Sequence, residues 1–95
     1  MKYAVILSLE AVADLRGLSA NVRATVRAAI EAHLRREPAR VSKSRIKRRR
    51  GLSRPQYRLR VDEVRVFYDA SGNTVEILAS VPKEAADEWL EKAGK

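Results

Sequence analysis

The sequence predicts one α+β domain over residues 1–95, with the element order β-α-α-β-β-β-α. Apolar residues recur at helical spacing between residues 9 and 37, and they alternate with polar residues, as in strands, between residues 57 and 81. A proline at position 82 then precedes a last amphipathic segment. We therefore expect a small, mostly antiparallel sheet with two N-terminal helices packed on one face and a short C-terminal helix.

The first forty residues predict one strand and two helices. The apolar run Tyr3–Leu7 has the length of a strand and is typical of a covered sheet. Ser8 is placed to cap a short helix over Leu9–Arg16, and Ser19 is placed to cap a second helix. The second helix has an apolar stripe opposite a stripe of Arg and Glu, and Pro38 ends it.

The composition excludes several classes of protein. The chain has no cysteine, which removes disulfide frameworks and thiolate metal sites and fits a reducing compartment. It has no apolar run near the ~20 residues of a membrane span and no signal peptide, so we expect a cytoplasmic protein without a membrane partner. His33, the single histidine, lies beside the apolar stripe of the second helix, and we interpret it as structural.

Positive charge is concentrated in the middle of the chain. The formal net charge is +8, and residues 40–65 hold eleven basic and two acidic side chains. This asymmetry predicts an electropositive face that binds a polyanion, with an affinity that salt weakens. The alternative is a solvated basic surface that only keeps the protein in solution.

The segment before residue 56 contributes most of this charge. An edge strand around Arg45–Arg49 would explain one or two of the cations, because charged edge strands resist aggregation. The rest of the cluster is interpreted as a surface for phosphate groups, which give affinity without reading sequence. The candidate residues, which would be RNA-binding if the anion is RNA, are Lys43, Arg45, Lys47, Arg48, Arg49, Arg50 and Arg54.

Residues 57–68 predict a β-hairpin with one basic face. The runs Tyr57–Val61 and Val64–Tyr68 alternate strictly, and two acidic residues between them form a two-residue loop. In this register Arg60 lies opposite Arg65, and Arg58 is on the same face. Facing like charges destabilise a sheet by a fraction of about 1 kcal/mol, so three arginines on one face indicate anion binding. The opposite, core-forming face consists of Tyr57, Leu59, Val61, Val64, Val66 and Tyr68.

The last third of the chain predicts one more strand. With a loop at residues 71–72, the alternating segment Thr74–Val81 pairs with the hairpin and continues its core face. This register places Leu78 opposite Arg65.

Pro82 opens the last predicted element, a helix over Lys83–Ala93. We interpret Trp89, on the apolar stripe of this helix, as the anchor that packs it onto the sheet. The alternative is that Trp89 docks a partner, since tryptophan is enriched at interfaces.

The order of these elements, with Tyr-Arg-Leu-Arg-Val at residues 57–61 and Val-Arg-Val-Phe-Tyr at residues 64–68, resembles the RelE/ParE toxin superfamily. The resemblance covers nearly the whole chain. Its members are toxins of type II toxin–antitoxin pairs: RelE-like toxins cut mRNA in the ribosomal A site, whereas ParE-like toxins inhibit DNA gyrase. The resemblance therefore implies a RelE-like fold and an antitoxin partner.

The resemblance also implies roles for individual residues. Arg58, Arg60 and Arg65 match the sheet residues with which RelE-like toxins hold and polarise the scissile phosphate. The implied reaction is attack of a ribose 2′-OH on the adjacent phosphate, which needs a base, an acid and cations for the developing charge. Lys83 replaces the usual arginine after the last strand, as a point charge instead of a bidentate fork. The implied catalytic residues are Arg58, Arg60, Arg65 and Lys83, with no metal and no cofactor.

Three other positions depart from the family pattern. The C-terminal segment lacks the usual Tyr or His that acts as general base, and Glu76 and Glu84 would replace it only if they turn towards the arginines. The usual hairpin glycine is Asp62 here, which tolerates turn geometries. Arg49 stands where the family has a leucine.

The resemblance leaves three functions open: a ribosome-dependent mRNA endonuclease, a non-enzymatic gyrase inhibitor, and a toxin fold that has lost toxicity. All three imply a small, partly disordered antitoxin from an adjacent gene. We expect this acidic or amphipathic partner to fold over the basic face or the groove beside the last helix. The free toxin is expected to be a monomer that forms a hetero-oligomer with its antitoxin, and mRNA on the ribosome is the expected target.

Overall fold

The computed structural model describes residues 2–40, 45–48 and 55–93. Within these residues the strands form one five-stranded sheet in the order β1-β5-β4-β3-β2. β1 runs parallel to β5 and the other neighbours are antiparallel, so the α+β class is confirmed and the basic segment does provide an edge strand. The strands are β1 (Ala4–Leu7), β2 (Ile46–Arg48), β3 (Tyr57–Val61), β4 (Val64–Ser71) and β5 (Thr74–Pro82).

The helices begin where the sequence predicts them. The Ser8 hydroxyl accepts the N–H of Ala11 at 3.1 Å, and the Ser19 hydroxyl accepts the N–H of Val22 at 3.4 Å, so both predicted caps are confirmed. The last helix starts with a short 3₁₀ turn, which lets the chain bend away from β5. The helical segments are α1 (Leu9–Arg16), α2 (Ala20–Ala29), the π-helix η1 (Ile30–Leu34), the 3₁₀ helix η2 (Lys83–Ala85) and α3 (Ala86–Ala93).

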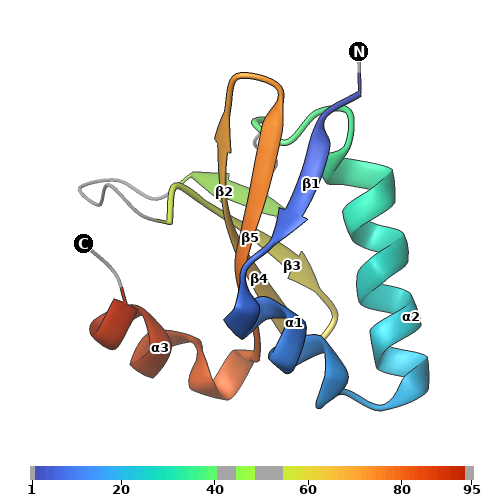
Figure 1. Cartoon of the computed structure of the whole chain (residues 1–95). Coiled ribbons are helices and arrows are strands. Elements are labelled where there is room, and N and C mark those ends of the chain that lie inside the picture. Colours follow the sequence, from blue (N-terminus) through green and yellow to red (C-terminus); the bar gives the residue numbers. More distant parts are fainter. Residues whose placement is uncertain (1, 41–44, 49–54, 94–95) are drawn as a thin grey trace.

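Different helices cover the two faces of the sheet (Figure 1). α1, α2 and η1 pack on one face and form the larger core with the inward residues of all five strands. α3 packs on the other face, over the ends of β4 and β5, in a smaller cluster. The smaller cluster consists of Phe67, Ala79, Val81 and Ala86, with Ala85, Trp89 and Leu90 packed against it.

The predicted register of the β3–β4 hairpin is confirmed. Val61 pairs with Val64 and Arg60 pairs with Arg65, so Asp62 and Glu63 form the two-residue loop. The alternation therefore sends the apolar residues to the larger core and the arginines to the opposite face.

The predicted register of β4 with β5 is wrong. The turn lies at Gly72-Asn73, one residue later than predicted, with Gly72 at a φ of 58° that glycine adopts without strain. A β-bulge then shifts the pairing by one further residue, because Tyr68 pairs with Ile77 whereas Phe67 pairs with Ala79. As a result Val81, and not the predicted Leu78, faces Arg65.

α1 holds the chain at this bulge. The Asp14 carboxylate accepts the N–H of Ser80 at 2.9 Å, and the Ser8 hydroxyl donates to the carbonyl of Leu78 at 3.0 Å. Burial raises the pKa of Asp14, while the hydrogen bond from Ser80 opposes that rise. Backbone groups that the bulge removes from the strand ladder thus find partners on α1.

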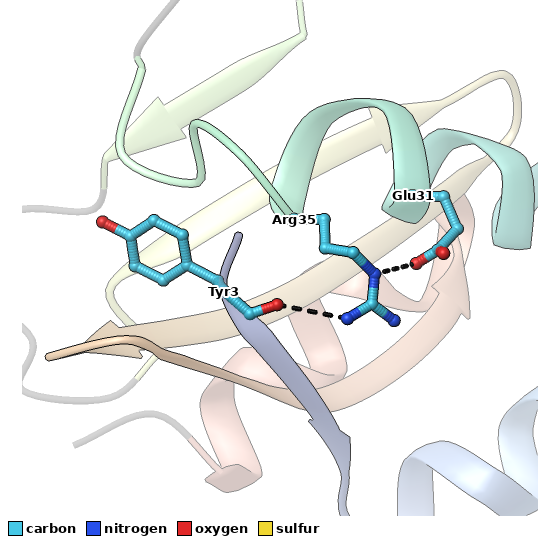
Figure 2. Close-up of polar contacts among 3 residues, drawn as sticks. All are labelled: Tyr3, Glu31 and Arg35. Carbon is cyan, nitrogen blue, oxygen red and sulfur yellow. Dashed lines mark hydrogen bonds and ion pairs between the residues drawn. The ribbon is translucent and has the colours of Figure 1, made fainter. Parts of the chain in front are cut away.

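Two further contacts hold the segment after η1 and the helix α3 against the sheet. Arg35 donates to the carbonyl of Tyr3 at 3.1 Å and to the carboxylate of Glu31 at 2.6 Å, which ties β1 to the end of the second helix (Figure 2). Trp89 stacks on Phe67 with ring centroids 4.8 Å apart and planes 5° apart. The predicted role of Trp89 as the anchor of the last helix is therefore confirmed.

Tyr68 provides a test of how the chain after η1 is held. Its ring is fully buried against Tyr57, and its hydroxyl donates to the carbonyl of Pro38 at 2.5 Å. We expect Tyr68→Phe to lower the free energy of unfolding by about 1–2 kcal/mol in urea titrations, because a buried carbonyl loses its donor. Tyr3→Phe is the control, since no residue in the described ranges hydrogen-bonds to the Tyr3 hydroxyl. Equal losses in both variants would contradict the assignment.

Candidate functional site

The structure brings Arg58, Arg60 and Arg65 to one face of the β3–β4 hairpin. Arg60 and Arg65 pair directly across the two strands, which lie about 4.8 Å apart in any sheet. Arg58 lies two residues before Arg60 on β3 and so shares its face. These three residues, called here the arginine face, lie on the side of the sheet away from the larger core.

The edge strand extends this basic surface. The N–H of Arg60 donates to the carbonyl of Arg45 at 2.7 Å, so Arg45, Arg60 and Arg65 follow one another across three strands. Lys47 pairs with Arg58 in the next row. Of the other predicted phosphate contacts, Arg48 lies on β2 opposite Tyr57, whereas Lys43, Arg49, Arg50 and Arg54 lie outside the described residues.

Backbone carbonyls, and not carboxylates, position Arg65. Its Nη1 donates to the carbonyl of Asp62 at 2.8 Å and to that of Val64 at 3.2 Å. These bonds hold the half-buried guanidinium over the hairpin loop without cancelling its charge. In the described part of the chain no carboxylate forms an ion pair with Arg65 or with the exposed Arg60. Both guanidinium groups therefore keep the positive charge that an anion requires.

Lys83 comes to the same hairpin loop but has a partner there. Its N–H donates to the carbonyl of Glu63 at 2.8 Å, and its Nζ lies 3.6 Å from the Glu63 carboxylate. Both side chains are largely exposed, so the ion pair is weak and opens at little cost. Lys83 is thus near the arginine face, although its charge is offset until Glu63 moves aside.

Neither the two tyrosines of the hairpin nor the two glutamates considered as general bases lie beside Arg60 and Arg65. Tyr57 and Tyr68 stack on each other in the larger core, on the opposite side of the sheet, and burial raises the pKa of Tyr68. Glu76 pairs with Asp69, because the bulge and the later turn move it along β4 away from the arginines. Glu84 is exposed on η2. The site therefore offers positive charge without an adjacent tyrosine or histidine.

No group of three or more histidine, aspartate or glutamate side chains in the described residues is arranged to hold a metal ion. None of the helices in the described ranges is long and apolar enough to cross a bilayer.

One polar pocket was not predicted from the sequence. It opens at the β2 edge of the sheet and is lined by Ala32, His33, Glu37, Arg40, Arg45 and Ile46. Its residues come from η1, the following loop and the edge strand, so no local sequence motif predicts the pocket. The one signal in the sequence is the single histidine close to a basic segment.

These features define the class of fold. The sheet is mixed, with the strand order β1-β5-β4-β3-β2, and α1 and α2 pack on one of its faces. The other face carries the arginines of the β3–β4 hairpin and the short last helix. This is the α+β architecture of the RelE-like toxins that the sequence resemblance implies.

Three solved structures that are similar to this chain are antitoxin–toxin complexes. The RelBE2 complex from Mycobacterium tuberculosis has a TM-score of 0.68 and 29% sequence identity, covering 86% of this chain and 99% of that chain. The RelB–RelE complexes from Methanococcus jannaschii and Pyrococcus horikoshii OT3 have TM-scores of 0.67 and 0.63 and identities of 18% and 20%. They cover 88% and 87% of this chain and 96% and 97% of theirs. No family model matches the chain, and no curated protein matches it closely. The chain has the RelE-like toxin fold.

The hairpin loop that positions the arginines gives a test of the backbone. Asp62 has a φ of 51°, the left-handed conformation that costs a residue with a Cβ about 1–2 kcal/mol. We expect the free energy of unfolding of Asp62→Val to be about 1–2 kcal/mol lower than that of Asp62→Gly in urea titrations. The reason is that valine is β-branched, whereas glycine adopts this conformation without the cost. Glu63→Val and Glu63→Gly are matched controls, because Glu63 is not in this conformation. The same gap at both positions would contradict the turn geometry.

Proposed function

We propose that this protein is the toxin of a toxin–antitoxin pair and that it arrests translation by cutting mRNA on the ribosome. The observation that carries the proposal is the arginine face, in which Arg60 and Arg65 pair across β3 and β4 and neither forms an ion pair with a carboxylate of the described residues. The RelE-like fold supports it, and the Mycobacterium tuberculosis likeness covers nearly the full length of that neighbour.

The proposed chemistry is intramolecular transesterification of RNA. The ribose 2′-oxygen attacks the adjacent phosphorus and gives its proton to water. The bond from phosphorus to the 5′-oxygen of the next nucleotide breaks, and that oxygen takes a proton from water, which leaves a 2′,3′-cyclic phosphate and a 5′-hydroxyl. Negative charge grows on the non-bridging oxygens as the phosphorus gains its fifth ligand, and the guanidinium groups of Arg60 and Arg65 stabilise that charge. Arg58 would hold the neighbouring backbone. Because the tyrosines of β3 and β4 lie in the larger core, electrostatic stabilisation supplies most of the rate enhancement within this chain.

An antitoxin would act on the same charges. The neighbouring solved structures are complexes of a toxin with an antitoxin, and residues 40–65 of this chain hold eleven basic and two acidic side chains. We propose a small acidic partner that is disordered alone, folds over the arginine face and joins the monomeric toxin in a hetero-oligomer. Neutralising the guanidinium groups would block phosphate binding in the cytoplasm without a change of fold.

Growth arrest tests the role of the arginine face. We expect Arg65→Ala and Arg60→Ala to restore growth after induction and to reduce mRNA cuts at translated codons by about 10²–10³-fold in primer extension. Arg36→Ala is the matched control, since that arginine is exposed and lies at the end of η1, away from the hairpin. Circular dichroism establishes that each variant folds. Intact mRNA in cells whose growth is completely arrested would contradict the proposal.

A gyrase inhibitor is the second candidate, because the arginine face has no tyrosine or histidine beside it. This candidate predicts that the purified protein blocks DNA supercoiling by gyrase in vitro, while messages stay intact in arrested cells. An unaffected gyrase would eliminate it.

A fold that has lost toxicity is identified by normal growth on overexpression without the neighbouring gene.

A further inference from the structure

The polar pocket at the β2 edge, named the edge pocket, combines flat, acidic and basic groups in a small space. His33 projects from η1, a five-residue π-helix, and π-turns occur frequently at functional sites. Glu37 and Arg40 stand on the loop that follows, and Arg45 closes the pocket from the start of β2. Ala32 and Ile46 provide its apolar surface.

The charges in the edge pocket do not suit a phosphate. Burial lowers the pKa of His33, and the nearby positive charge of Arg45 lowers it further, so the imidazole is neutral near pH 7. The Glu37 carboxylate faces the same space and, through its ion pair with Arg40, offsets one of the pocket's two positive charges. A site built for a phosphate would instead hold a protonated histidine and exclude the carboxylate.

The same groups match the edges and faces of a nucleobase. A carboxylate accepts two parallel hydrogen bonds, and guanine offers two adjacent donors on its Watson–Crick edge, at N1 and N2. A guanidinium group donates to O6 and N7 of guanine, and unpaired RNA bases stack on aromatic rings. Adenine presents an acceptor at N1, where Glu37 would repel it, so this arrangement favours guanine.

Glu37 can exchange its present ion pair with Arg40 for hydrogen bonds to a base. Its two carboxylate oxygens each lie 3.3 Å from Nη1 of Arg40, and both side chains are mostly exposed, with 60% and 74% of their surface accessible. An exposed pair of this kind contributes little to stability. A base edge can therefore replace it, leaving Arg40 free to reach the other side of the same base.

The edge pocket adjoins the arginine face through one residue. Arg45 lines the pocket, and its carbonyl accepts the N–H of Arg60, which belongs to the arginine face. A nucleic-acid strand whose phosphate lies on Arg60 and Arg65 would thus pass the mouth of the pocket as it crosses the β2 edge. Both sites then contact neighbouring parts of one strand.

We propose that the edge pocket binds a guanine base of single-stranded RNA, with Glu37 accepting from N1 and N2, Arg40 or Arg45 donating to O6 and N7, and His33 stacking on the ring. This assignment rests on the proposed action on RNA and adds base selectivity to it. The pocket distinguishes guanine from adenine beside the bound phosphate, which the arginine face alone does not do.

The single histidine makes the pocket directly observable. The imidazole resonances of His33 in the purified, isotope-labelled protein are followed by NMR during titration with GMP, AMP and inorganic phosphate. We expect GMP to move them saturably in the millimolar range and AMP to bind about tenfold more weakly. Phosphate alone should leave them in place. Glu37→Gln should bring GMP and AMP within about twofold of each other, whereas Glu88→Gln, which alters an ion pair on α3, should not.

Two RNA hexamers, UUGUUU and UUUUUU, test whether the pocket also binds guanine within a single strand. Tighter binding of UUGUUU by fluorescence anisotropy, lost in Glu37→Gln, supports the assignment for RNA. An equal response of His33 to phosphate and GMP, or no response to GMP at all, overturns it, and so does guanine binding that survives Glu37→Gln. Because these titrations need neither ribosomes nor the Arg65 side chain, the edge pocket and the proposed toxin activity can each fail while the other stands.

Discussion

The pairing of Arg60 with Arg65 across the central hairpin is the constraint on which the other features depend. Facing like charges cost a sheet a fraction of about 1 kcal/mol. On the opposite face of the same strands, Leu59 and Val66 are fully buried and pair with each other, and each contributes about 1.5–3 kcal/mol. The apolar side therefore outweighs the charged side, and the hairpin stably presents two cations that no carboxylate of the described residues neutralises.

The surrounding elements make this surface accessible. The β-bulge of β5 and the later turn bring Val81 opposite Arg65 and leave Glu76 beside Asp69, further along the sheet. α3 covers the neighbouring part of the face, where Trp89 stacks on Phe67. Backbone carbonyls of the loop then orient Arg65 without neutralising it.

The sequence predicts the central hairpin well because its information is local. Strict alternation from Tyr57 to Tyr68 sets which side chains share a face, and a shift by one residue would bury the arginines. The register of β5 could not be derived in this way. A bulge adds one unpaired residue without breaking the apolar pattern, and it is stabilised by Asp14, far away in the chain. The edge pocket was missed for a related reason, since His33 and Arg45 come together only when η1 packs beside β2.

On the proposed function, the charge that would bind RNA would also let an acidic partner inhibit the toxin. A partner present at 100 times its dissociation constant stabilises the folded toxin by about 2.7 kcal/mol, several times the repulsion between two facing arginines. Binding of the proposed partner would therefore both offset the repulsion between the two arginines and block the proposed phosphate contact. Because Glu37 pairs with Arg40 in the edge pocket, the pocket offers an acidic segment less uncompensated positive charge than the arginine face does. The proposed inhibition through the arginine face and the proposed base selection through the edge pocket would thus be separable, with Arg45 at the boundary between the two sites.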